Sequence, residues 1–224
     1  MATKKDVVRV LCLHGWRSCQ KVMDFQIRLF KESMKRCSRK QCHFEVVNAT
    51  FPASGPSHAE LLEFFGDIPY FEWWDAQNAE NSKEPIIYKG IEDSIKRVDY
   101  IVQRHGPFDV VLGFSQGSTF TSILNAHYTT QAQPIPWKVC VHISGMVSRD
   151  PVLHAQLEKM RPLRLPAVFV LGQQDYLYSY AKELIPYYDQ ETCHVYEFEG
   201  GHRFPYKHEI EYDAIVRQVL AFCT

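Results

Sequence analysis

The sequence has no long apolar run and no excess of charge of one sign. No apolar stretch in its 224 residues reaches the length of about 18 residues that a membrane-spanning helix needs. The 25 lysines and arginines are balanced by 26 aspartates and glutamates, so the chain lacks the basic character of nucleic-acid-binding proteins. We therefore expect a protein with no membrane span and no nucleic-acid partner, whose ligand is a small molecule.

Paired cysteines and targeting signals are also missing. The seven cysteines include no C-x-x-C pair and their number is odd, which argues against a disulfide scaffold and against a zinc ribbon. The N-terminal sequence MATKKDVVRVLCLHG passes from a short charged start directly into a predicted strand, without the apolar segment and cleavage site of a signal peptide. These absences predict a cytoplasmic protein in a reducing compartment.

What the sequence does contain is an alternation of short apolar runs with segments of helical periodicity. The runs predict buried strands at 7–13, 44–47, 108–112, 139–143, 167–171 and 194–198. Apolar residues at helical spacing predict helices at 23–34, 91–102, 181–188 and 210–219. Such alternation predicts an α/β fold with a doubly wound, mostly parallel sheet and ligands at the carboxyl ends of the strands. With 46% hydrophobic residues, we expect one domain over residues 1–224.

Residues 51–88 interrupt this alternation with a long segment rich in proline and aromatic residues. Connections of this length inside a compact domain are usually functional loops or disordered insertions, and the aromatic content argues against disorder. We expect a cap or a pocket wall, with the alternative that the aromatic side chains only pack against the body of the fold. If Phe64, Phe65, Phe71, Trp73 or Trp74 lines an acyl tunnel, the protein should prefer medium or long acyl chains, because each buried methylene group adds to binding.

The motif G-x-S-x-G directly follows the third predicted strand, in VVLGFSQGSTF at residues 110–120. A buried strand precedes Ser115 and a helical pattern follows it, so the turn between them has almost no length. A serine at such a strand-to-helix turn is the nucleophile elbow, in which small flanking residues allow a strained backbone. The motif alone is weak evidence, because common residues produce it by chance.

A serine nucleophile needs a base to remove its proton and an acid to orient that base. In α/β-hydrolases the acid and then the histidine follow the serine along the chain. Here PAVFVLGQQD brings Asp175 to a strand end, and HVYEFEGGH brings His202 to the next one. The rival acid Asp189 lies within a helical pattern. We therefore predict the triad Ser115, Asp175 and His202.

An acyl-transfer site also needs donors for the developing oxyanion. The backbone N–H of Gln116 begins the helix after the nucleophile, where such groups have no intrahelical partner. The loop after the first strand, in VLCLHGW, directs the N–H of Trp16 into the same site. We predict that these two amides form the oxyanion hole, and that His14 and His142 make structural hydrogen bonds instead of acting as the base.

With these residues assigned, the sequence resembles the FSH family of serine hydrolases, α/β-hydrolases that include fungal esterases. The resemblance covers nearly the whole chain and rests on LCLHGW, FEWW, GPFDVVLGFSQGS, HISG and GGHRFP. It implies an α/β-hydrolase fold, the triad Ser115, Asp175 and His202, and hydrolysis of carboxylic esters or, in some members, of thioesters. The aromatic stretch after the acid, beginning at Tyr176, departs from the family pattern and could reshape the acyl pocket.

The sequence therefore predicts a serine carboxylesterase that acts on a small-molecule ester of an apolar, medium-chain to long-chain acid. The scheme requires no metal or organic cofactor. Phosphate-loop and dinucleotide motifs are absent, since neither G-x-x-x-x-G-K nor G-x-G-x-x-G occurs. The alternatives are a thioesterase on acyl-CoA or acyl-carrier substrates, a peptidase with the same triad, and a binding protein that retains only the fold.

Overall fold

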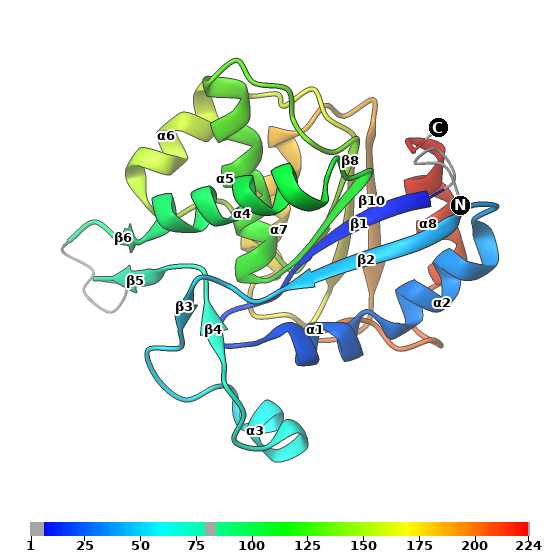
Figure 1. The fold of residues 1–224 in the computed structure, drawn as a ribbon, viewed down its shortest axis with the longest axis horizontal. Helices are drawn as coiled ribbons and strands as arrows, with labels where there is room; N and C mark the ends of the chain where they lie inside the picture. Colours follow the sequence, from blue (N-terminus) through cyan, green and yellow to red (C-terminus); the bar gives the residue numbers. More distant parts are fainter. Residues whose placement is uncertain (1–6, 79–83, 224) are drawn as a thin grey trace.

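The computed structural model describes residues 7–78 and 84–223, and a six-stranded parallel sheet runs through its centre (Figure 1). The strand order is β10-β9-β8-β7-β1-β2. The strands are β1 (Val7–Leu13), β2 (Gln41–Val47), β7 (Val110–Phe114), β8 (Val139–Ile143), β9 (Ala167–Gly172) and β10 (Cys193–Phe198). All six predicted strands are present and differ from the prediction only at their ends.

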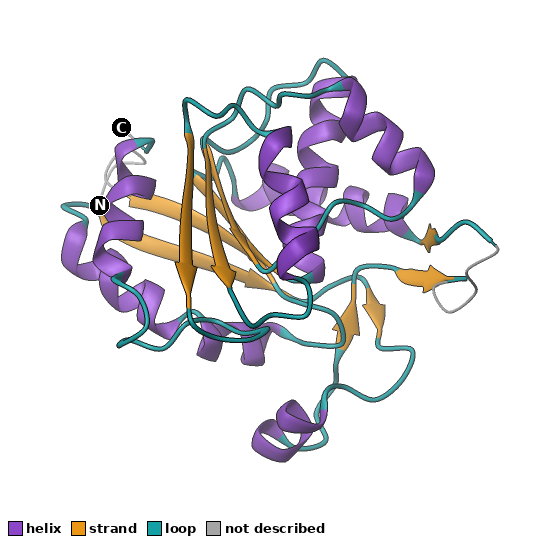
Figure 2. Ribbon diagram, turned by 180° about the vertical axis from the view of Figure 1, so that it is seen from behind, coloured by secondary structure: helices purple, strands orange, loops and turns teal. Residues whose placement is uncertain are grey.

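Helices cover both faces of this sheet, as Figure 2 shows from behind. One face packs against α1 (Gln20–Gln26), α2 (Arg28–Cys37) and α8 (Tyr212–Ala221), and the other against α4 (Ile91–His105), α5 (Gln116–Thr130), α6 (Pro151–Lys159), α7 (Tyr178–Leu184) and the 3₁₀ helix η2 (Ile185–Tyr187). Alternate side chains of β1 pack on opposite faces of the sheet: Leu11 and Leu13 belong to the core beside α4 and α5, whereas Val10 and Cys12 belong to the core beside α2 and α8. The predicted doubly wound sheet is therefore confirmed.

The topology indicates where a ligand site is expected. The chain passes from β1 outward to β2 and then returns to β7 on the other side of β1. At such a switch point the loops after the two neighbouring strands diverge and leave a crevice at the carboxyl ends. The crevice here lies between the loop after β1 and the turn after β7. No helix in the described part of the chain is long and apolar enough to cross a membrane.

One helical prediction was wrong in detail, and one further helix was not predicted. The pattern over 23–34 forms two helices, α1 and α2, because Ile27 between them has φ −81° and ψ 6°, which ends the first helix. Helix α6 was missed because Leu157 is its only buried residue, so its apolar periodicity is weak. Its start is nevertheless marked in the sequence: Asp150 accepts hydrogen bonds from the first-turn amides, and Pro151 follows it.

The 51–88 insertion forms small elements outside the central sheet. Strands β3 (Phe51–Pro52) and β4 (Phe71–Glu72) pair antiparallel, as do β5 (Asp75–Gln77) and β6 (Ile87–Lys89). Helix α3 (Ala59–Phe65) has no buried residue and stands away from the sheet in both views (Figures 1 and 2). The two ladders lie beside the carboxyl ends of β1 and β2. The insertion therefore stands where a wall of the crevice is expected.

Candidate active site

The turn after β7 has the strained backbone that the sequence predicts. Ser115 connects β7 directly to α5 and has φ 52°, which L-residues rarely adopt. The flanking glycines are required by close packing: a Cβ on Gly117 would lie 2.1 Å from the carbonyl oxygen of Leu13, and a Cβ on Gly113 would lie 2.5 Å from the carbonyl oxygen of Gly117. The two glycines thus allow strand, turn and following helix to fit against β1.

The three predicted triad residues come together at this turn. Asp175 follows β9 and His202 follows β10, in the loops at the carboxyl ends of their strands. The Nδ1 atom of His202 lies 2.9 Å from Oδ2 of Asp175, and its Nε2 atom lies 2.9 Å from Oγ of Ser115. The acid, the imidazole and the hydroxyl therefore form one continuous hydrogen-bonded chain.

The surroundings of Asp175 determine which nitrogen of His202 carries the proton. Burial opposes ionisation of Asp175, but hydrogen bonds from His202 and from the Leu177 amide outweigh it and lower the pKa of the carboxyl. An ionised carboxylate can only accept, so Nδ1 of His202 donates and Nε2 accepts from Ser115. The imidazole contacts the rings of Phe114 and Tyr176, at centroid distances of 5.1 and 4.9 Å, which restricts its rotation.

The predicted oxyanion residues flank Ser115. Gln116 is the first residue of α5, and Trp16 lies in the loop after β1. This loop approaches the nucleophile closely, since a Cβ on Gly15 would lie 3.2 Å from the Cβ of Ser115. Among the described residues, no backbone hydrogen bond occupies the N–H of Trp16 or of Gln116. Both amides are thus available to a bound oxygen.

The side chain of Gln116 has a structural role that the sequence did not indicate. Its Oε1 accepts a hydrogen bond of 3.0 Å from the amide of Trp73, and its Nε2 donates to the carbonyl of Trp74 at 3.2 Å. The indole of Trp73 donates to the carbonyl of His14 at 2.9 Å. These bonds attach the insertion both to the elbow and to the loop after β1.

Two buried histidines make structural hydrogen bonds. His14 donates from Nδ1 to the Gly15 carbonyl at 2.7 Å, and its Nε2 accepts from the Ala49 amide at 2.9 Å. His142 bonds to the hydroxyls of Ser118 and Tyr188, at 2.9 and 2.8 Å. Burial lowers the pKa of His14 to about 4 and that of His142 to about 3. Both imidazoles are therefore neutral at pH 7.

These two histidines predict a loss of stability in mild acid. Their folded-state pKa values lie below the value of 6.5 for an exposed histidine, so the unfolded chain binds more protons between about pH 6.5 and pH 4. Stability is therefore complete above pH 6.5 and falls as the pH decreases. From pH 7 to pH 5 we expect the free energy of unfolding to fall by roughly 3 kcal/mol, measured by urea denaturation.

The variant His142→Gln separates this effect from other titrations. With one buried imidazole removed, the fall between pH 7 and pH 5 should shrink by about half. The exposed His208 serves as a control, because His208→Gln should leave the fall unchanged. An undiminished fall in His142→Gln would show that other groups cause the acid sensitivity.

A pocket of about 290 Å³ opens beside Ser115. Apart from Ser115 and Gln116, it is lined by Trp16, His58, Trp74, Ala76, Ile86, Tyr88, Thr119, Met146, Arg149, Tyr176 and Leu177. These residues come from the loop after β1, the insertion, α5 and the loops after β8 and β9. Most of the lining is apolar or aromatic, as small-molecule sites generally are.

Some aromatic side chains of the insertion line this pocket, and others pack elsewhere. Of the five aromatic side chains proposed for an acyl tunnel, only Trp74 lines it. Trp73 is fully buried and packs against Phe120, with ring centroids 4.9 Å apart. Phe64 and Phe65 pack against Phe25 instead. Trp74 therefore forms part of the pocket wall while also packing inward against Tyr88, with ring centroids 4.5 Å apart, whereas Trp73 only packs inward.

The rival acid Asp189 lies away from the triad. It sits in the turn after η2, where its carboxylate accepts a hydrogen bond from the Glu191 amide at 3.0 Å. That bond is typical of a carboxylate that caps a turn. In the described part of the chain, no cluster of three or more histidine, cysteine or acidic side chains could hold a metal ion.

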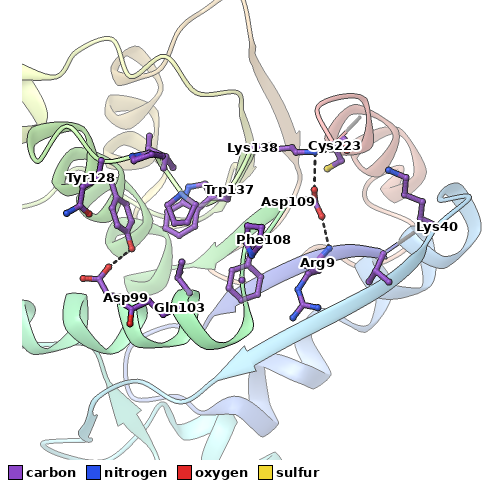
Figure 3. A pocket seen from close by; sticks show the side chains of 18 residues that line it. Arg9, Lys40, Asp99, Gln103, Phe108, Asp109, Tyr128, Trp137, Lys138 and Cys223 are labelled. Carbon is purple, nitrogen blue, oxygen red and sulfur yellow. Dashed lines mark hydrogen bonds and ion pairs between the residues drawn. The ribbon is translucent and has the colours of Figure 1, made fainter. Parts of the chain in front are cut away.

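A larger hollow, about 980 Å³ in volume, lies at the opposite ends of the strands (Figure 3). Its wall includes Arg9 and Phe108, near the amino ends of β1 and β7, and Trp137 before β8. Opposite charges pair within it, as Lys138 lies 3.2 Å from Asp109. Because the triad lies at the carboxyl ends, this hollow is not part of the candidate active site.

Comparison with solved structures shows the same fold. A variant of SOBER1 from Arabidopsis thaliana matches with a TM-score of 0.66 at 16% identity, over 97% of this chain and 100% of that one. A carboxylesterase from Mesorhizobium loti matches with a TM-score of 0.62 at 15% identity, over 96% of this chain and 88% of that one. At these identities the likeness concerns the fold alone.

Comparison with protein sequences identifies the family. An esterase from Caenorhabditis elegans is 26% identical over 95% of this chain and 94% of its own length. The human esterase OVCA2 is 28% identical over 78% of this chain and 79% of its own length. The family described as serine hydrolase (FSH1) matches residues 2–213, which confirms the resemblance seen in the motifs and the prediction of a serine esterase. The chain belongs to the FSH1 family of serine hydrolases.

Proposed function

We propose that the chain hydrolyses medium-chain carboxylic esters through an acyl-enzyme on Ser115. The observation that supports this most directly is the chain of 2.9 Å hydrogen bonds from Asp175 through His202 to Ser115, beside an apolar pocket. A protein that only binds a ligand requires neither this series of hydrogen bonds nor a serine with a strained backbone.

In this proposal Oγ of Ser115 attacks the carbonyl carbon of the ester while Nε2 of His202 takes the hydroxyl proton. The N–H groups of Trp16 and Gln116 bind the oxyanion of the tetrahedral intermediate. When the intermediate collapses, His202 donates its proton to the departing alcohol. Water then attacks the acyl-enzyme with His202 again as base, and Asp175 stabilises the imidazolium in both steps.

The pocket volume supports a medium acyl chain. A water molecule takes about 30 Å³ in the liquid, and a methylene group is of similar size, so 290 Å³ holds about ten such groups. The ester itself occupies two or three of them. About eight acyl carbons therefore fill the pocket, and further carbons extend into solvent, where they gain little.

This proposal predicts a chain-length profile. For para-nitrophenyl esters from acetate to palmitate, kcat/KM should rise up to a chain of about eight carbons and then level off. Each methylene that is buried contributes about 0.8 kcal/mol, or roughly a factor of four. The measurement is initial-rate hydrolysis, with the Ser115→Ala variant as the background. No Ser115-dependent rate at any chain length would refute the proposal.

The pocket residue Met146 provides a test of the pocket itself. Met146→Ala enlarges the cavity and should move the levelling point toward longer chains by about two carbons. Met146→Leu has nearly the same volume and should leave the profile unchanged. If both variants keep the original profile, the acyl chain lies elsewhere.

We further propose that residues 1–224 form a single domain located in the cytoplasm. Helices on both faces of one sheet support the first part, since the two hydrophobic clusters share its strands. All seven cysteines are free, which supports a reducing compartment.

A further inference from the structure

Arg149 is a cation in an otherwise uncharged pocket. Among the described residues that line the pocket, it is the only lysine or arginine, and neither aspartate nor glutamate is present. His58 is the other basic side chain there, and burial followed by the charge of His202 lowers its pKa, so it is neutral at pH 7. Arg149 is exposed and therefore stands at the rim of the pocket, not at its base.

The backbone at Arg149 is firmly held. Its amide donates a hydrogen bond of 2.9 Å to the hydroxyl of Tyr88, and the amide of Tyr88 donates one of 2.9 Å to Oδ2 of Asp150. The other oxygen of Asp150 caps α6, accepting from the amides of Val152 and Leu153 at 2.9 and 3.3 Å. Thus the guanidinium extends from a fixed point in the pocket wall.

The guanidinium of Arg149 has no hydrogen-bond or ion-pair partner among the described residues. The neighbouring Asp150 is buried, and both of its oxygens accept backbone amides. The other arginines near the site are occupied: Arg17 lies 3.6 Å from Glu72 and donates to two further oxygens, and Arg203 makes two bonds to Glu209. Of these three arginines, Arg149 is the one whose planar set of donors is available for a carboxylate.

We propose that Arg149 binds a carboxylate at the far end of the acyl chain, so that preferred substrates are monoesters of dicarboxylic acids. This inference rests on the proposed ester hydrolysis. An acyl chain that begins at Ser115 and fills the apolar pocket ends at its rim, where Arg149 is exposed. A terminal carboxylate there remains partly hydrated and meets the guanidinium, whereas a terminal methyl group leaves the cation without a partner.

The test compares two para-nitrophenyl esters of equal chain length, the suberate monoester and the octanoate. We expect the Arg149→Gln variant to lower the ratio of their kcat/KM values, suberate over octanoate, by about tenfold. The change should lie in KM for the suberate ester, because binding remote from the reacting carbon affects ground state and transition state alike. Arg149→Lys keeps the charge and should retain most of the ratio.

Arg217 provides a matched control. It is an exposed arginine on α8, so Arg217→Gln changes the net charge equally and should leave the ratio unchanged. Raising the ionic strength to about 1 M shortens the screening length to about 3 Å and should lower the wild-type ratio toward that of Arg149→Gln.

Two results would overturn the inference. One is an unchanged ratio in Arg149→Gln while octanoate hydrolysis remains dependent on Ser115, which leaves the proposed function intact. The other is that Arg149→Gln lowers kcat/KM only for a substrate with a carboxylate on the alcohol and not on the acyl chain. This is measured by comparing 4-(octanoyloxy)benzoate with its methyl ester. Octanoate hydrolysis that survives Ser115→Ala would instead refute the proposed function itself.

Discussion

Replacing Ser115 by alanine is expected to lower kcat for para-nitrophenyl octanoate by about 10⁵-fold or more. The variant retains the pocket, His202 and the oxyanion amides, but it has no oxygen to form the acyl-enzyme. In a well-studied serine protease, loss of the nucleophile costs about 10⁶ in kcat. Labelling by a fluorophosphonate probe should disappear together with turnover.

The fold should survive this change. Serine and alanine both carry a Cβ and meet the same steric strain at the positive φ of residue 115, so the thermal midpoint should stay close to that of the wild type. Ser122, on the buried side of α5, donates to the Thr119 carbonyl at 2.7 Å; Ser122→Ala serves as a control that should keep its activity. Full labelling of Ser115→Ala would mean that another residue is the nucleophile.

The second large effect is expected for Asp175→Asn, which should lower kcat by about 10⁴-fold at pH 7. An amide in this position can donate toward Nδ1 of His202, which then accepts and leaves the proton on Nε2. That nitrogen can no longer accept the Ser115 proton. The corresponding change in a serine protease triad has an effect of this size. Steady-state kinetics and fluorophosphonate labelling rates both measure it.

Asp189 is the matched control for this variant. Asp189→Asn removes a carboxylate that caps a turn, and kcat should stay within about twofold of the wild-type value. A large loss in Asp189→Asn with little loss in Asp175→Asn would reverse the assignment of the acid. Equal, small effects in both would indicate that orientation of His202 does not depend on a carboxylate.

Much of the site was predictable because it depends on local sequence. Gly113, Ser115 and Gly117 lie within five residues, and their spacing reflects a turn that only small side chains allow. Asp175 and His202 were predicted because parallel strands bring their carboxyl ends to one edge, so a residue after a strand is placed by strand order alone. The structure brings all three within hydrogen-bond distance, and their catalytic roles remain a prediction.

The pocket could not be predicted in the same way. Trp73 and Trp74 are adjacent in the sequence and both are buried, yet only Trp74 lines the pocket. The side chain of Gln116 holds the backbone of both residues by hydrogen bonds. Such contacts join residues more than forty positions apart, and no local pattern encodes them.

The sequence by itself determined the six strands of the central sheet, the motifs of the FSH family and the positions of the residues predicted to form the triad. These properties follow from periodicity, turn chemistry and the parallel arrangement of strands, which act over short stretches or over the whole sheet. Only the tertiary structure decided which side chains line the pocket, and that Arg149 faces it without a carboxylate partner among the described residues. The reason is physical: the size and charge of a pocket depend on how loops from distant strands pack together, and on which carboxylates, such as Asp150, are already bound to backbone amides.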